Sequence, residues 1–227
     1  MKIILFGKNN KPGIKEVIEY LNIHFKEVKI FLGDRKDKFP IEAKHNSSDI
    51  LISYMSPWII PDEILKKTKL WNINFHPGSP NYSGIGCTNF ALYNKEKTYG
   101  VTAHLMEKKV DSGKIIGVKR FPILENDNAY SLTLKSCGFM LSLFFEILDY
   151  IIKNNKLPKC NEKWTKAPYT RKQLEELCVI TPSMSEEEVK RRVKATQFPG
   201  MPGAYIKLYN YKFEYNEQRC IKFSRHR

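Results

Sequence analysis

Short apolar runs alternate with amphipathic stretches through the first half of the chain. Four runs are short enough to be strands and lie at residues 3–6, 28–32, 50–52 and 70–75. Between the first two, Ile14, Val17 and Leu21 recur at helical spacing, and residues 61–67 are typical of a second, short helix. Strands that alternate with helices predict an α/β fold with a Rossmann-like, mostly parallel sheet flanked by helices.

The second half of the chain combines further strands with one long helix. Residues 88–93 predict a helix, and residues 100–106 and 115–121 predict two strands. A polar cluster at residues 125–128 caps a helix that continues to about Lys153. This helix is so rich in apolar residues that the sheet or a partner must cover most of it.

Beyond Lys153 the chain becomes a linker rich in Lys, Pro and Asn, followed by a small tail. Residues 185–188 are spaced as a capping box, which predicts a helix that ends near Thr196. Aromatic residues alternate over residues 204–215, a pattern typical of a β-hairpin. The tail is therefore predicted to be a small helix plus hairpin.

Length and composition are consistent with this division. The chain has 227 residues, of which 42% are hydrophobic and 27% are charged, as in a folded globular protein. We predict a main domain over residues 1–180 and a small C-terminal appendage over residues 181–227. The longest uncharged apolar stretch, residues 136–145, is shorter than the roughly 20 residues that a membrane span requires. Met1 leads directly into a strand without a signal-peptide pattern, so a cytoplasmic location is expected.

Charge and cysteine content narrow the range of partners. The net charge of +14 favours phosphate-bearing partners, such as a nucleotide, an RNA or a polyglutamylated cofactor, but a lysine-rich solvated surface explains it equally well. The five cysteines are scattered, with no pair at Cys-x-x-Cys spacing. Neither a disulfide framework nor a metal site is therefore predicted.

The most informative segment follows the fourth predicted strand. Side chains alternate between the two faces of a strand, so Asn74 and His76 emerge together at its carboxyl end, whereas Phe75 faces the opposite layer. Open α/β sheets bind ligands at this edge. An amide and an imidazole there are suited to proton transfer and to stabilisation of an oxyanion, although such a pair also commonly fixes a loop by hydrogen bonding.

A second segment makes this pattern more specific. A Gly-Val-Thr-x-His strand at residues 100–104 is followed by Asp111 in an Asp-Ser-Gly turn, 35 residues after His76. Together with Asn74-x-His76, this arrangement resembles the folate-dependent formyltransferase family. The family includes the glycinamide ribonucleotide, methionyl-tRNA and nucleotide-sugar N-formyltransferases. The resemblance covers about residues 1–122 well and the remainder weakly.

The resemblance implies a site and a cofactor. Asn74, His76 and Asp111 correspond to the catalytic trio. Asn74 and a protonated His76 would stabilise the oxyanion, His76 would also shuttle protons near neutral pH, and Asp111 would orient His76. N10-formyltetrahydrofolate would be the formyl donor. Its pterin ring would be held by the loop that carries Trp58, Ile59 and Ile60, and by Val110 from the Asp111 loop. His104 matches a family position outside the trio and is interpreted as a structural strand residue.

The acceptor is inferred from the tail. Methionyl-tRNA formyltransferases carry a C-terminal domain of about a hundred residues, whereas 47 residues follow Ile180 here. Glycinamide ribonucleotide formyltransferases end near the close of the catalytic domain, which leaves the helix and hairpin unexplained. The chain therefore looks most similar to nucleotide-sugar N-formyltransferases, which implies a dTDP-4-amino-4,6-dideoxyglucose type of acceptor and a role in the O-antigen of surface polysaccharides. A homodimer is expected, with no stable nucleic-acid partner and no membrane.

Other functions stay open from the sequence alone. The same trio would serve a formyltetrahydrofolate hydrolase, in which water replaces the amine. Formyl transfer to glycinamide ribonucleotide or methionyl-tRNA is also compatible with the trio. A catalytically silent folate- or nucleotide-binding module would not need Asn74, His76 and Asp111 together.

Overall fold

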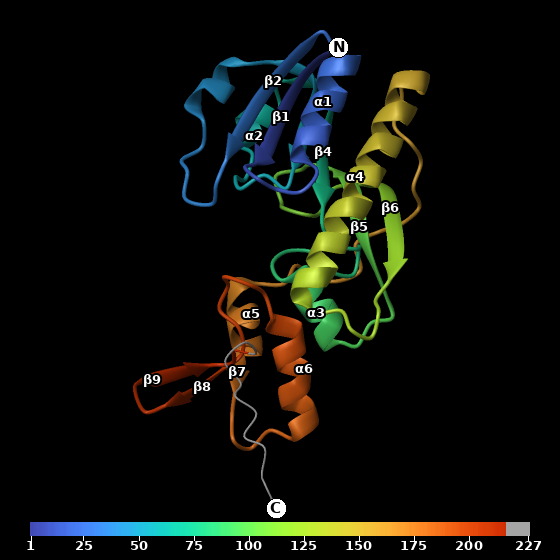
Figure 1. Cartoon of the computed structure of the whole chain (residues 1–227). Helices are drawn as coiled ribbons and strands as arrows, with labels where there is room; N and C mark the ends of the chain where they lie inside the picture. Colours follow the sequence, from blue (N-terminus) through green and yellow to red (C-terminus); the bar gives the residue numbers. More distant parts are fainter. Residues whose placement is uncertain (217–227) are drawn as a thin grey trace, which may run out of the picture.

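A computed structural model describes residues 1–216 and places a six-stranded sheet at the centre of the main domain (Figure 1). The strand order is β2-β1-β3-β4-β5-β6. Their bounds are β1 Lys2–Lys8, β2 Glu27–Gly33, β3 Ser48–Tyr54, β4 Thr68–His76, β5 Thr98–Leu105 and β6 Ile115–Pro122. The first four strands are parallel, and β5 and β6 are antiparallel to their neighbours. The predicted Rossmann-like, mostly parallel sheet is confirmed.

Helices cover both faces of this sheet. Their bounds are α1 Ile14–His24, η1 Ile41–His45, α2 Asp62–Leu65, α3 Cys87–Tyr93, α4 Ala129–Asn154, α5 Arg171–Leu177 and α6 Glu186–Thr196. Alternation along β1 divides the core, because Ile3 and Leu5 pack with α1 and α4, whereas Ile4 and Phe6 pack with η1 and α2. The carboxyl ends of β1 to β4 thus meet at one edge of a sheet that is buried on both sides.

The long helix α4 begins at a well-formed cap and runs along the sheet (Figure 1). The Asn128 side chain accepts hydrogen bonds from the first turn, and the Asn128 backbone N–H donates to the Ser131 hydroxyl. By length and composition alone, α4 is long and apolar enough to cross a bilayer, but the buried core helix of a globular domain can meet the same criteria. It packs against β5 and β6, and its buried positions include Met140, Phe144 and Leu148. The sheet is therefore the apolar cover that the sequence requires.

A second, three-stranded sheet forms the end of the described chain. It has the order β7-β8-β9, with β7 Val179–Ile180, β8 Tyr205–Leu208 and β9 Tyr211–Glu214. The predicted hairpin is present, and it projects from the rest of the molecule (Figure 1). Strand β7 pairs in parallel with β8, so this sheet begins before the predicted boundary at residue 181.

Two local features of the tail differ from the sequence prediction. Helix α5 lies in the segment read as linker, and it begins at a capping box made by Thr170 and Gln173. In α6, Ser185 caps the backbone of Glu188 as predicted. The Glu188 carboxylate does not return to the cap, because it binds Arg191 and Arg192 within the same helix.

Candidate active site

Strand β4 delivers Asn74 and His76 to the carboxyl edge of the sheet, while Ile73 and Phe75 point into the core. The register of β4 with β5 sets Asn74 opposite His104. Asn74 Nδ2 lies 2.9 Å from His104 Nε2 and donates to it. The other ring nitrogen of His104, Nδ1, donates to the Leu105 carbonyl at 2.8 Å. The amide of Asn74 is therefore oriented by a buried histidine from the neighbouring strand.

His76 is buried and is held on both sides of its ring. Its Nε2 donates to the Tyr82 carbonyl at 3.0 Å, and its Nδ1 lies 3.5 Å from Asp111 Oδ2. Gly78 is required beside the ring, because a Cβ there would lie 2.5 Å from His76 Nε2. Burial alone would lower the pKa of His76, but the Asp111 carboxylate, Cys87 and the Tyr82 carbonyl outweigh it and raise this pKa to about 9. His76 is thus cationic at neutral pH, and its titration lies above the neutral range expected from the sequence.

Asp111 approaches both histidines from the loop between β5 and β6. Its backbone is left-handed, with φ of 48°. One oxygen lies 3.4 Å from His104 Nε2, and the other accepts the Gly84 backbone N–H at 3.1 Å. Burial opposes ionisation, yet the His76 cation and the Gly84 backbone N–H hold the pKa of Asp111 down at about 2. Asp111 and His76 therefore form a buried ion pair beside Asn74.

A cavity of about 660 Å³ adjoins this ion pair and contains all seven predicted site residues. Asn74, His76 and Asp111 line it together with Trp58, Ile59, Ile60 and Val110. The side chains of Ile59 and Val110 are 75% and 49% exposed, whereas Ile60 is buried. The orientation of the Trp58 side chain is fixed, because its Nε1 donates a hydrogen bond to the Asp37 carbonyl at 2.9 Å. The cavity thus has a polar wall with a buried ion pair and an apolar wall that a flat ring could cover.

Sequence reasoning missed the cations around the same cavity. Besides the predicted residues, its lining includes five basic side chains, one at the end of β1, three in loops and one in α5: Lys8, Lys11, Arg35, Lys109 and Arg171. Within residues 1–216, none of these five makes an ion pair. The net charge indicated an anionic partner, but only the fold brings these cations to one cavity. The site therefore suits a ligand with both an apolar ring and negative charge.

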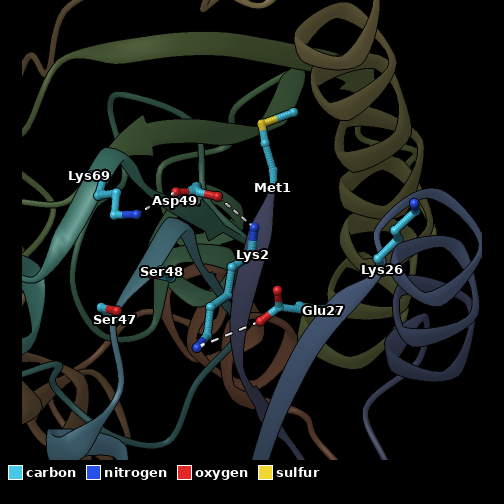
Figure 2. Close-up of a pocket in the computed structure, with 8 residues that line it drawn as sticks. All are labelled: Met1, Lys2, Lys26, Glu27, Ser47, Ser48, Asp49 and Lys69. Carbon is cyan, nitrogen blue, oxygen red and sulfur yellow. Dashed lines mark hydrogen bonds and ion pairs between the residues drawn. The ribbon is translucent and has the colours of Figure 1, made fainter.

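A second hollow, of about 290 Å³, lies at the amino ends of β1 to β3, and Figure 2 shows its lining. Lys2 pairs there with Glu27, and Lys69 pairs with Asp49. Because most of its charges are already paired, this hollow offers little to an ionic ligand. Among the described residues, no group of three or more His, Cys, Asp or Glu is placed to hold a metal ion.

Comparison with known proteins relates this site to a family. Residues 34–139, which carry Asn74, His76 and Asp111, match the family model described as formyl transferase. The chain is 33% identical to the bifunctional polymyxin resistance protein ArnA of Wigglesworthia glossinidia brevipalpis, over 93% of the chain and 37% of that protein. It is 26% identical to a GDP-perosamine N-formyltransferase of Brucella melitensis, over 88% of the chain and 75% of that protein. The chain spans 55% and 62% of the two methionyl-tRNA formyltransferases from Dictyoglomus that it matches, so it covers less than two thirds of several curated relatives.

Solved structures share the fold over almost the whole chain. A sugar N-formyltransferase from Shewanella superposes with a TM-score of 0.75 at 20% identity, over 95% of this chain and 96% of that one. An N-formyltransferase from Helicobacter canadensis, solved in complex with folinic acid and dTDP-3-aminofucose, superposes with a TM-score of 0.72 at 22% identity. The match covers 92% of this chain and 85% of that one. At these identities the likeness establishes the fold. The formyl transferase family model matches residues 34–139, the segment that builds the buried ion pair, so this segment of the chain is similar to that family.

Proposed function

We propose that the protein is a folate-dependent N-formyltransferase that transfers a formyl group from N10-formyltetrahydrofolate to the amine of a nucleotide-linked amino sugar. One observation carries the proposal: Asn74, His76 and Asp111 converge on one wall of a large cavity, and His76 is held there as a cation. These groups suit a reaction in which negative charge develops on a carbonyl oxygen.

Each member of the trio has a distinct role in this proposal. N10-formyltetrahydrofolate supplies the formyl carbon, to which the acceptor amine adds as the bond to N10 breaks. Asn74 donates a hydrogen bond to the carbonyl oxygen as its charge grows, and the positive charge of the neighbouring His76 imidazolium stabilises the same oxygen. His76 gives a proton to the departing nitrogen, and the proton that the amine loses restores it. Asp111 keeps His76 cationic and oriented.

The apolar wall of the cavity fits the proposed donor. Ile59 and Val110 present exposed apolar surface to the cavity, and the loop of Trp58 is fixed by its own hydrogen bond. A flat heteroaromatic ring would bury this surface. The Helicobacter canadensis relative was solved with folinic acid, and another sugar formyltransferase was solved with 5-N-formyl-THF, which supports a reduced folate as donor.

The unpaired cations support an acceptor that carries phosphate. Lys8 is the last residue of β1, Lys11 precedes α1, and both line the cavity. Relatives act on or bind sugars linked to GDP or dTDP. We favour a dTDP-4-amino-4,6-dideoxyglucose type of acceptor, used in surface polysaccharide such as O-antigen, with residues 1–180 as catalytic domain and the enzyme in the cytoplasm.

Replacing Lys8 and Lys11 by Gln is expected to raise the KM for the nucleotide sugar by about tenfold, because one charge-assisted contact contributes roughly 1.5 kcal/mol or more. The KM for N10-formyltetrahydrofolate should change less. Steady-state kinetics with each substrate varied in turn checks this, with Lys26→Gln in the second hollow as the matched control. An unaltered acceptor KM in the double variant would rule out these two lysines as the phosphate contacts.

The projecting hairpin supports a homodimer. Tyr209, Tyr211 and Phe213 are 91%, 71% and 58% exposed, which is more aromatic surface than a small sheet commonly leaves uncovered. Changing Tyr211 and Phe213 to Ser should convert a dimer into a monomer in sedimentation velocity. Ile23→Ser, at an exposed position of α1, should leave the mass unchanged. A wild-type protein that sediments as a monomer at tens of micromolar would contradict the homodimer.

A further inference from the structure

A segment without helix or strand, residues 155–170, runs back along the site after α4, and we call it the strap. It is fixed at several points. Glu162 pairs with Arg120 of β6, Thr165 Oγ1 donates to Asn81 at 2.7 Å, and Tyr169 exchanges backbone hydrogen bonds with the residues flanking Gly84. The strap is therefore attached both to β6 and to the loop that receives the Asp111 carboxylate.

Trp164 lies at the centre of the strap and contacts the Asp111 loop. Its indole Nε1 donates to the Gly113 carbonyl at 2.8 Å. The other side of Gly113 is closed, because a Cβ there would lie 2.0 Å from the Leu105 carbonyl oxygen. The backbone two residues after Asp111 is thus held between β5 and the indole, which leaves the loop little freedom to withdraw the carboxylate.

The same indole packs against both histidines of the site. Its ring centroid lies 5.9 Å from that of His76 and 5.0 Å from that of His104, with interplanar angles of 74° and 84°. Edge-to-face packing of this kind fixes the orientation of each ring. One side chain therefore touches the two imidazoles that flank Asp111 and also anchors the Asp111 loop.

We infer that Trp164 is a positioning residue of the active site, which holds the Asp111 carboxylate against His76 by anchoring Gly113 and packing edge-to-face on both histidine rings. The inference deepens the proposed formyl transfer and rests on it for any effect on turnover. Trp164 was not singled out from the sequence, because only the folded strap carries it to β4 and β5.

The ionisation of His76 reports whether the anchor works. The groups that face this imidazole are Asp111 from its loop, Cys87 from α3 and the Tyr82 carbonyl. Of these, Asp111 carries the full negative charge and depends on the Gly113 anchor. Loss of the indole N–H should let the carboxylate move away, and the pKa of His76 should then fall towards its ordinary value of 6.5.

The test compares Trp164→Phe, which keeps a ring but lacks the donor, with Trp164→Ala and with Trp71→Phe on β4 as the matched control. The His76 ring is titrated by NMR in the free protein, and kcat and KM are measured separately. We expect Trp164→Phe to lower the pKa of His76 by about one or more, within the range that a nearby opposite charge supplies, and to reduce kcat by about tenfold with a smaller change in KM. Trp164→Ala should lower both the pKa of His76 and kcat further, and Trp71→Phe should change neither.

A Trp164→Phe protein with the wild-type titration of His76 would overturn the inference, whatever the Ala variant does. The titration needs no substrate. If wild-type protein transfers no formyl group, the proposed function fails while the NMR result still decides the role of Trp164.

Discussion

Replacing Asp111 by Asn is expected to slow formyl transfer by a factor of about 100 or more, because it removes the charge that keeps His76 cationic. Asn keeps the shape of the side chain and tolerates the left-handed backbone at this position. The oxygen of its amide can still accept the hydrogen bond from the Gly84 backbone N–H. The loss should therefore appear in kcat without loss of the fold.

Circular dichroism and stopped-flow or steady-state assays on the purified variant would check this result. Asp49→Asn is the matched control, because Asp49 is also an aspartate of lowered pKa but lies in the second hollow (Figure 2). Near wild-type turnover in Asp111→Asn would show that the buried ion pair does not serve catalysis.

The pH dependence should follow the same ion pair. The raised pKa of His76 means that the imidazolium is present below this pKa and is lost as the pH rises through about 9. Wild-type kcat should therefore fall above about pH 9. In Asp111→Asn the fall should begin nearer pH 6.5, the ordinary value for histidine.

The second large effect concerns stability. Phe144→Ala is expected to lower the free energy of unfolding by about 3–5 kcal/mol, as is typical when a buried Phe is truncated to Ala. Phe144 lies on α4 and is fully buried. Its ring contacts those of Tyr54 and Phe75, at centroid distances of 6.0 and 5.2 Å. The cavity would thus open where α4 packs on β3 and β4.

Chemical denaturation gives the measurement, and Leu134→Ala on the exposed side of α4 is the control. That variant should change stability by less than about 1 kcal/mol. A Phe144→Ala protein as stable as the wild type would mean that α4 does not pack on the sheet as described.

The sequence was sufficient for features that depend on local periodicity. Alternation along β4 placed Asn74 and His76 on the face opposite Phe75, and the structure brings all seven predicted residues to one cavity. The fold class was predictable because each strand and helix buries its own apolar face. The roles of these residues stay predictions until variants are measured.

Features that depend on register or on distant segments were not predictable. His104 meets Asn74 only because β4 and β5 pair antiparallel in one particular register. Helix α5 was missed within the Lys- and Pro-rich linker, although Thr170 and Gln173 have capping-box spacing. Strand β7 is too short to show a period, and its partner lies far along the chain.

The central claim is transfer of a formyl group to a nucleotide-linked amino sugar. A comparison of acceptors, each assayed separately, tests this claim most directly. Purified protein is incubated with N10-formyltetrahydrofolate and, at matched concentrations, a dTDP-linked 4-amino-4,6-dideoxy sugar, glycinamide ribonucleotide, methionyl-tRNA or no acceptor. We predict rapid formation of tetrahydrofolate and N-formyl sugar only with the dTDP-linked sugar. Faster transfer to glycinamide ribonucleotide or methionyl-tRNA, or equal release of formate without any acceptor, would contradict the account.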